Sequence, residues 1–311
     1  MIDRRSLLFG AAALTSLPVT RSRAGAAPRS SSPTIRLWPG DAPGGGGPRG
    51  PLDISDKGAV SNVAHPFLTR HDPARPNGAA VLVAGGGGYK RIEEGSEARP
   101  AAQWLVEQGI TAFVLTYRLP GEGWQDGAMA PVQDAQRALR LIRSQSPGLD
   151  PHRLGVLGFS SGGHLLGMAS TRSGWRSYTQ VDAADDTSAR PDFAALIYPV
   201  VTLEPPYDDT STRRQLVGNH PTLRESAEWS VETHVRRDCP PMFLVQADDD
   251  PISNPANTRI LEAACRQAGV PVERHHFSSG GHGFGLGRPG TPTTAWPALY
   301  QHWLTGIQVL T

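Results

Sequence analysis

Residues 158–164 read Gly-Phe-Ser-Ser-Gly-Gly-His, and this stretch decides the fold class. It satisfies the pattern G-x-S-x-G, with Ser160 at the centre. A largely apolar run at 153–158 precedes it and predicts a strand, and the stretch 165–169 that follows is typical of a helix. In this context the pattern marks a serine on a strained strand-to-helix turn, where flanking glycines let the backbone approach closely. The sequence therefore predicts that Ser160 is a nucleophile above the edge of an α/β sheet.

A serine nucleophile needs a base, and the base needs a carboxylate that orients it. Three aspartates, at positions 248 to 250, follow the apolar run 242–247, and any of them could reach a histidine nearby. His282 lies in a glycine-rich loop after the run 272–277. Loops at the carboxyl ends of parallel strands meet at one edge of a sheet, and Ser, Asp, His is the order typical of this arrangement. We therefore predict a Ser-His-Asp triad.

The glycine run 85–88 directly follows the apolar run 79–84. Such a run exposes successive backbone N–H groups, which can stabilise the negative oxygen of a tetrahedral intermediate. We expect Gly87, Gly88 and the N–H of Ser161 to form this oxyanion hole. The alternative interpretation of this glycine run is a flexible loop without a catalytic role. A phosphate-binding loop is disfavoured, because no G-x-x-x-x-G-K-[ST] follows and Arg91 occupies the third glycine position of G-x-G-x-x-G.

Apolar runs alternate with helical patterns along most of the chain. Strands that are apolar throughout and alternate with helices favour a mostly parallel sheet with helices on both faces, which is the α/β class. The polar stretch 202–237 lacks such runs and is expected to form a small excursion over the top of the sheet. The predicted strands are 79–84, 111–117, 153–158, 193–198, 242–247 and 272–277, and the predicted helices are 101–108, 132–143, 257–268 and 295–304.

The chain resembles the α/β-hydrolase serine esterases, in particular the bacterial acetylxylan-esterase-like branch, from about residue 37 to residue 304. The resemblance implies the α/β-hydrolase fold, with Ser160 as nucleophile, Asp250 as acid and His282 as base, and it implies no metal and no organic cofactor. Two segments depart from the family pattern: 84–85 is Ala-Gly instead of Cys-Pro or His-Gly, and 253–255 is Ser-Asn-Pro instead of Val-Pro-Val. The matching segments are 37–44 (LWPGDAPG), 86–89 (GGGY), 117–120 (YRLP), 134–138 (DAQRA), 158–164, 189–193 (ARPDF) and 280–285 (GGHGFG).

The expected activity is hydrolysis of short acyl esters, foremost acetyl groups, on a small-molecule or oligosaccharide substrate. A peptidase of the prolyl-oligopeptidase kind shares the triad but usually carries a propeller domain, for which 311 residues leave no room. A non-catalytic binding protein on the same fold is the second alternative, and the presence of Ser, Asp and His speaks against it. Lysine and arginine number 30 against 29 acidic residues, a balance that disfavours a nucleic-acid partner.

Residues 1–26 are typical of an export signal, because Arg4-Arg5 precede a short apolar run and a small-residue site follows it. The paired arginines resemble a twin-arginine signal, so we expect a periplasmic or secreted protein. The apolar run is shorter than the roughly 20 residues of a membrane-spanning helix, so no stable membrane insertion is expected after its removal. Residues 27–51 are rich in Pro, Gly and Ser and are expected to form an irregular lead-in. Residues 52–311 would then be one catalytic domain.

Three other polar residues and two cysteines have non-catalytic interpretations. His164, one turn after Ser160, is expected to be a buried histidine with satisfied hydrogen bonds. Asp134 and Arg118 are expected to make structural contacts. Cys239 and Cys265 are too few for a disulfide scaffold and are expected to be buried thiols, although one bridge is possible in an oxidising compartment.

Overall fold

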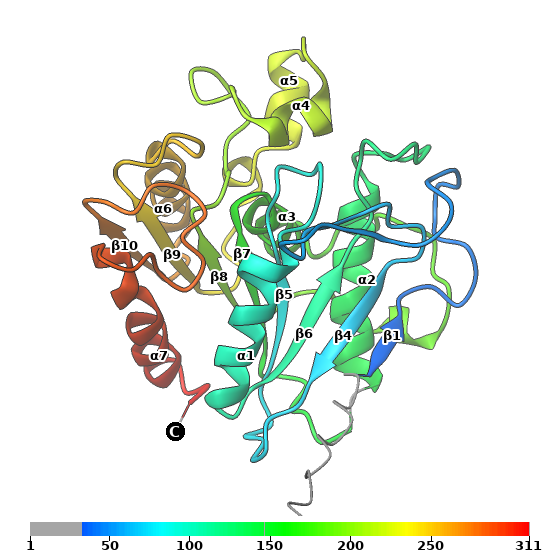
Figure 1. Ribbon diagram of the computed structural model, residues 1–311, viewed down its shortest axis with the longest axis horizontal. Helices are drawn as coiled ribbons and strands as arrows, with labels where there is room; N and C mark the ends of the chain where they lie inside the picture. Colours follow the sequence, from blue (N-terminus) through cyan, green and yellow to red (C-terminus); the bar gives the residue numbers. More distant parts are fainter. Residues whose placement is uncertain (1–32, 146, 311) are drawn as a thin grey trace, which may run out of the picture. The chain divides into compact units, whose positions relative to one another are not determined.

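The computed structural model describes residues 33–145 and 147–310. These residues form an eight-stranded sheet with the strand order β1-β4-β6-β5-β7-β8-β9-β10 (Figure 1). A short two-stranded ladder joins β2 to β3 outside it. The strands are β1 (Thr34–Arg36), β2 (Asp53–Ile54), β3 (Val60–Ser61), β4 (Phe67–His71), β5 (Ala80–Ala84), β6 (Thr111–Thr116), β7 (Leu154–Phe159), β8 (Phe193–Ile197), β9 (Met242–Ala247) and β10 (Val272–Phe277).

The sheet is parallel from β6 to β10, and β4 is antiparallel to both β1 and β6. Its register places the predicted functional segments next to one another. Ala84 pairs with Gly158, so the glycine loop and the turn at Ser160 leave the sheet side by side. Phe277 pairs with Ala247, so the loop of His282 and the run of three aspartates also leave it together. The turn at Ser160 and the loop of His282, which are 122 residues apart in the sequence, therefore leave the sheet at the same edge.

Helices cover both faces of the sheet because successive side chains of its strands point to opposite sides. The apolar faces of α2, α3 and α6 pack on one side together with Leu82 of β5. Those of α1 and α7 pack on the other side together with Val81 and Val83 (Figure 1). The helices are a π-helical segment at Glu94–Ala98 followed by α1 (Arg99–Glu107), α2 (Ala130–Gln145), α3 (Ser160–Thr171), α4 (Ser211–Val217), α5 (Leu223–Glu228), α6 (Ala256–Ala268) and α7 (Trp296–Gly306).

The mostly parallel α/β sheet with helices on both faces is therefore confirmed, and the two strands that break its parallel order were not foreseen. β1 lies within the lead-in that was expected to be irregular, and it forms the edge of the sheet beside β4. β4 reads Phe-Leu-Thr-Arg-His, so it lacks the continuous apolar run that identified the central strands. Antiparallel strands near an edge tolerate such polar residues because they are only partly buried. The predicted signal at 1–26 lies outside the described residues.

The excursion at 202–237 contains α4 and α5 but no strand, as expected (Figure 1). Both cysteines are buried thiols, and the Sγ of Cys265 lies 3.6 Å from the Sδ of Met242. Within residues 33–145 and 147–310, no helix combines the length and the apolar character that a membrane crossing requires.

Arg118 and Asp134 form a fully buried ion pair, with 2.9 Å between the guanidinium and the carboxylate. The indole Nε1 of Trp38 and the backbone N–H of Arg118 also donate to Asp134, each at 2.8 Å. This cluster fixes the loop after β6 to α2. Its role is structural, because its members satisfy one another and none of them bonds to Ser160, His282 or Asp250.

Replacing Asp134 with asparagine is expected to lower the free energy of unfolding by about 3–5 kcal/mol, because it leaves the buried guanidinium of Arg118 without a charged partner. Urea denaturation followed by circular dichroism measures this change. The exposed Asp72, which pairs with Arg70, offers the matched control, and Asp72→Asn is expected to cost less than about 1 kcal/mol. Equal losses for the two variants would contradict the structural role assigned to Asp134.

Candidate active site

Ser160 occupies the turn between β7 and α3 with a backbone φ of +51°. This left-handed conformation is uncommon for a non-glycine residue and stores strain of about 1–3 kcal/mol. The glycines on either side of the serine are required sterically. A Cβ on Gly158 would lie 2.5 Å from the carbonyl oxygen of Gly162, and one on Gly162 would collide with the carbonyl oxygens of Ala84 and Gly85. The turn therefore fits only the residues that the pattern supplies, and it projects Ser160 above the sheet.

The three predicted catalytic side chains form a continuous hydrogen-bonded chain. The Oγ of Ser160 lies 2.8 Å from Nε2 of His282, and Nδ1 of His282 lies 2.8 Å from Oδ2 of Asp250. The carboxylate of Asp250 is fully buried, whereas the imidazole keeps 17% of its surface exposed. The structure thus brings together all three residues that sequence reasoning placed in the triad.

The loop after β9 holds Asp250 in one orientation. Its Oδ1 accepts the backbone N–H groups of Ile252 at 2.8 Å and Ser253 at 2.9 Å, and its Oδ2 accepts from Nε2 of Gln246 at 2.9 Å. The hydroxyl of Ser253 donates in turn to the carbonyl oxygen of Pro199 at 2.6 Å. The unusual segment 253–255 therefore anchors the acid loop and keeps Oδ2 directed at His282.

The two neighbouring aspartates are exposed and make other contacts. Asp249 accepts the backbone N–H of Gly281 at 2.7 Å, and this bond lowers the pKa of its carboxyl. Asp248 lies 3.1 Å from Nδ1 of His276 at the surface. Neither aspartate reaches His282, so the structure separates the acid from the two loop residues. Across the described ranges, no three His, Cys, Asp or Glu side chains are grouped so that they could hold a metal ion.

The glycine loop lies beside Ser160, but its N–H groups have different partners. The N–H of Gly88 donates to the Oγ of Ser161 at 2.8 Å, and the N–H of Gly86 donates to Glu97 at 2.6 Å. No acceptor among the described residues engages the N–H groups of Gly87 and Ser161. The expectation for Gly88 therefore needs correction, because the side chain of Ser161 already occupies its N–H. Within the described part of the chain, Gly87 and Ser161 remain as donors without an acceptor, and Gly87 directly follows Gly86, which lies against Ser160.

Two residues that sequence reasoning missed lie directly behind the site. The carboxylate of Glu97 accepts from Gly86 and, at 3.0 Å, from the hydroxyl of Tyr198. The ring of Tyr198 lies 5.0 Å from the ring of His282, between centroids. Both residues are buried in segments that look like ordinary packing elements. The only signal in the sequence was the position of Glu97. It falls on the core-facing side when the helical pattern of 101–108 is extended by one turn toward the N-terminus.

His164 is buried and satisfied, as expected. Its Nδ1 accepts from the hydroxyl of Tyr89 at 3.0 Å, and its Nε2 donates to the carbonyl oxygen of Trp229 at 2.7 Å. Burial lowers its pKa to about 4, so the ring is neutral at physiological pH. The ring therefore stabilises α3 and does not compete with His282 as a base.

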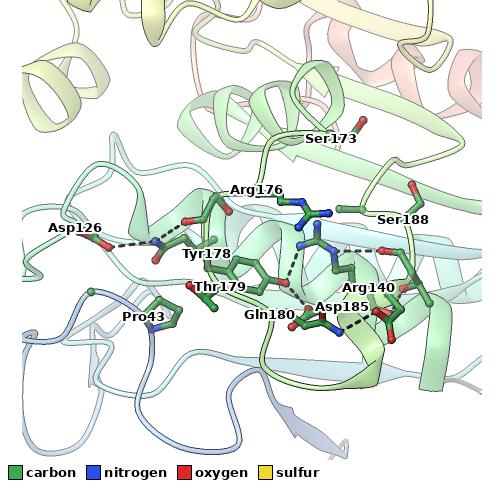
Figure 2. Close-up of a pocket in the computed structure, with 17 residues that line it drawn as sticks. Pro43, Asp126, Arg140, Ser173, Arg176, Tyr178, Thr179, Gln180, Asp185 and Ser188 are labelled. Atoms are coloured by element: carbon green, nitrogen blue, oxygen red, sulfur yellow. Dashed lines mark hydrogen bonds between the residues drawn. The ribbon is translucent and has the colours of Figure 1, made fainter.

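A polar cavity of about 990 Å³ lies on the flank of α2 (Figure 2). None of the residues that line it belongs to the triad. Its lining includes Ser173, which follows the end of α3 opposite to Ser160; twelve helical residues span about 18 Å. Its walls bind one another: Nη1 of Arg140 donates to the hydroxyl of Tyr178 at 2.7 Å, and that hydroxyl donates to Asp185 at 2.6 Å (Figure 2). The cavity is therefore not the acyl-binding part of the site.

Comparisons with known proteins agree with this fold. The BD-FAE family model matches residues 70–265. A curated acetylxylan esterase of Xylanibacter ruminicola is 31% identical over 246 residues, which are 76% of this chain and 46% of that protein. The chain thus spans less than half of the length of this relative, and a match to endo-1,4-beta-xylanase B of Butyrivibrio fibrisolvens covers 32% of that protein.

Two solved structures are similar over nearly their whole length. The acetyl ester-xyloside bifunctional hydrolase of Caldicellulosiruptor lactoaceticus superimposes with a TM-score of 0.74 at 32% identity, over 90% of this chain and 98% of that one. The propionate-bound esterase Est2 of Thermogutta terrifontis gives a TM-score of 0.66 at 23% identity, over 84% and 95%, and it supports the fold alone. The chain belongs to the BD-FAE family and has the α/β-hydrolase fold.

Proposed function

We propose that this protein is a serine esterase that hydrolyses short-chain acyl esters, foremost acetyl esters of carbohydrates. The observation that carries the proposal is the pair of 2.8 Å contacts that link Ser160, His282 and Asp250, with the serine on a strained turn. A nucleophile, a base and an orienting carboxylate within hydrogen-bonding distance are what acyl transfer through a covalent intermediate requires. The family membership supports the same reaction class.

In the proposed mechanism, Nε2 of His282 takes the proton of Ser160 as Oγ attacks the carbonyl carbon of the ester. Asp250 holds the Nδ1–H tautomer and stabilises the imidazolium that forms. The free N–H groups of Gly87 and Ser161 donate to the negative oxygen of the tetrahedral intermediate. His282 then protonates the departing alcohol, and the same imidazole activates a water molecule that hydrolyses the acyl-serine. The acid is released and Ser160 is regenerated.

A carbohydrate substrate is proposed from the relatives. The Xylanibacter protein is described as an acetylxylan esterase, and the Caldicellulosiruptor structure as an acetyl ester-xyloside bifunctional hydrolase. Release of acetate from acetylated xylan by the purified protein tests this proposal, with chemically deacetylated xylan as the blank. Hydrolysis of nitrophenyl acetate without any acetate released from xylan would leave an esterase with a different natural ester. Failure to react with a covalent serine probe would favour the binding-protein alternative.

Acetate esters are expected to turn over faster than octanoate esters, by on the order of tenfold or more in kcat/KM. The excursion that contains α4 and α5 presents one exposed large hydrophobic side chain, Leu223, and no apolar face that could act as a lipase lid. A methylene that finds no apolar contact gains none of the roughly 0.8 kcal/mol that its burial would provide, so a longer acyl chain adds no binding to offset its bulk. A series of nitrophenyl esters from acetate to octanoate measures the preference, and a maximum at octanoate would refute it.

We also propose that the protein is exported through the signal at residues 1–26. The support is the sequence pattern of paired arginines, a short apolar run and a small-residue site. Cell fractionation followed by N-terminal sequencing tests this proposal, and replacing Arg4 and Arg5 with lysine is expected to retain the protein in the cytoplasm if the twin-arginine route is used.

A further inference from the structure

Glu97 is a buried carboxylate that the proposed mechanism does not use. Its residue is 4% exposed, in the π-helical segment before α1. Its Oε2 accepts the N–H of Gly86 at 2.6 Å. A Cβ on Gly86 would lie 2.7 Å from Cβ of Ser160 and 3.1 Å from Oε2 of Glu97, so this glycine is held between the nucleophile and the carboxylate. Glu97 therefore fixes the start of the loop that carries the free N–H of Gly87.

The second oxygen of Glu97 reaches the loop that carries the base. Its Oε1 accepts from the hydroxyl of Tyr198 at 3.0 Å, and that hydroxyl accepts the N–H of Gly285 at 3.0 Å. Gly285 lies three residues after His282, and the ring of Tyr198 lies 5.0 Å from the imidazole. One carboxylate thus connects the oxyanion loop to the histidine loop.

The backbone around this connection is strained in the same way as at Ser160. Tyr198 directly follows β8 with a φ of +40°, which is an outlier for so bulky a residue. Such strain persists where surrounding contacts enforce it, and it gathers at functional sites. The π-helical geometry of 94–98 is likewise rare and frequent at functional sites. The fold therefore places the carboxylate of Glu97 and the hydroxyl of Tyr198 together at the expense of local strain.

Every donor in this group has an acceptor when Glu97 is ionised, and protonation of Glu97 upsets this match. The donors are the N–H groups of Gly86 and Gly285 and the O–H of Tyr198, and the acceptors are the two oxygens of Glu97 and the oxygen of Tyr198. Protonation of Glu97 adds a fourth donor and weakens the oxygen that carries the proton as an acceptor. A buried donor must then lose its partner, which costs about 1–3 kcal/mol, or the loops must move.

We propose that Glu97 is a positioning residue for ester hydrolysis, whose ionised carboxylate holds the oxyanion loop through Gly86 and the histidine loop through Tyr198. This inference rests on the proposed function of Ser160 and His282. Glu97 makes no contact with the reacting atoms in this scheme; it acts through the two loops that do.

The pKa of Glu97 lies near neutral pH, where the proposed esterase would work. Burial raises its pKa to about 7, against the opposing effects of the Gly86 and Tyr198 hydrogen bonds and of a positive charge on His282. Glu93 on the same segment raises it further, and the buried hydroxyl of Tyr117, after β6, stays neutral because its own pKa is raised. Activity should therefore fall more steeply with proton concentration than protonation of the base alone would make it fall, across the pH range in which Glu97 takes up its proton.

The decisive measurement is the pH profile of kcat/KM for hydrolysis of phenyl acetate. For the unmodified protein we expect the acid limb of the logarithmic plot to exceed a slope of one across the titration of Glu97. For Glu97→Gln we expect a slope of one and a kcat about 10–100-fold lower, with KM within about threefold, because a small displacement of loops costs transition-state stabilisation. An acid limb that never exceeds a slope of one in the unmodified protein, or that exceeds one in Glu97→Gln, would overturn the proposal.

Glu94→Gln is the matched control. Glu94 belongs to the same π-helical segment and is 3% exposed, but its carboxylate binds Thr116 and Arg99 rather than either loop. We expect this variant to keep the steep acid limb and a kcat within about threefold of the unmodified protein. An equal loss of kcat in both variants would show that any carboxylate of this segment is merely structural.

Tyr198→Phe supplies a second variant that does not change the charge. Loss of the Tyr198 hydroxyl removes a hydrogen bond that lowers the pKa of Glu97. We therefore expect the acid limb of kcat/KM to move to higher pH, whereas an unchanged limb would contradict the coupling.

Titration with diethyl p-nitrophenyl phosphate keeps a failure of this inference apart from a failure of the proposed function. The reagent should release one equivalent of p-nitrophenol per competent site and modify Ser160, and all rates are expressed per titrated site. Full activity without modification of Ser160 would reject the proposed mechanism itself. Stoichiometric modification with unchanged profiles in both Glu97→Gln and Tyr198→Phe would reject only the role of Glu97.

Discussion

Replacing Ser160 with alanine is expected to lower kcat for ester hydrolysis by on the order of 10⁴-fold or more. The substitution removes the Oγ that lies 2.8 Å from Nε2 of His282, so no acyl-enzyme can form. The turn keeps its φ of +51°, which alanine and serine tolerate about equally poorly, and the side chain differs by one oxygen. The free energy of unfolding is therefore expected to change by less than about 1 kcal/mol.

Steady-state kinetics on nitrophenyl acetate and urea denaturation together test this expectation. Ser173→Ala is the matched control, because Ser173 lies beyond the opposite end of α3 beside the polar cavity (Figure 2). It should leave kcat unchanged. A folded Ser160→Ala protein that kept most of its turnover would reject the proposed nucleophile, and a loss of fold would be visible in the denaturation curve.

The central sheet and the triad could be predicted from the sequence because each leaves a local signal. Runs such as 79–84 and 242–247 are apolar throughout, which is what burial on both faces of a parallel sheet requires. The G-x-S-x-G pattern is equally local, since the turn excludes side chains at Gly158 and Gly162 for steric reasons. Parallel topology then places the loops of Asp250 and His282 at the same edge without further information.

The remainder depends on contacts between distant segments, which no single stretch encodes. β4 was missed because its residues Thr, Arg and His carry no apolar run, and its place in the sheet comes from pairing with β6. The N–H of Gly88 is occupied by the Oγ of Ser161, which is 73 positions away in the sequence. The glycine run alone therefore cannot tell which of its N–H groups is available to the substrate. The contact of Glu97 with Tyr198 likewise spans 101 positions. Local patterns thus identified the catalytic side chains but not the hydrogen bonds that orient them.

Replacing Asp250 with asparagine is expected to lower kcat by about 10⁴-fold, as in the best-studied triad. Two backbone N–H groups, of Ile252 and Ser253, hold Oδ1 as an acceptor, so the new amide must direct its NH₂ group toward Nδ1 of His282. Nδ1 then becomes the acceptor and the ring proton moves to Nε2, which can no longer take a proton from Ser160. The buried Oε1 of Gln246 has no hydrogen-bond partner among the described residues and can turn to accept from the new amide, so the loop should remain folded.

Asp249→Asn is the matched control, because it makes the same chemical change one residue earlier on the same loop. Its Oδ1 can still accept the N–H of Gly281, and its exposed carboxylate does not reach His282. This variant is therefore expected to keep most of the activity. Measured as kcat on folded proteins, the ranking should place Asp250→Asn near inactivity and Asp249→Asn within about threefold of the unmodified protein. The reverse ranking would assign the acid to Asp249, and it would mean that the segment 253–255 moves the loop in solution so that a different carboxylate orients the imidazole.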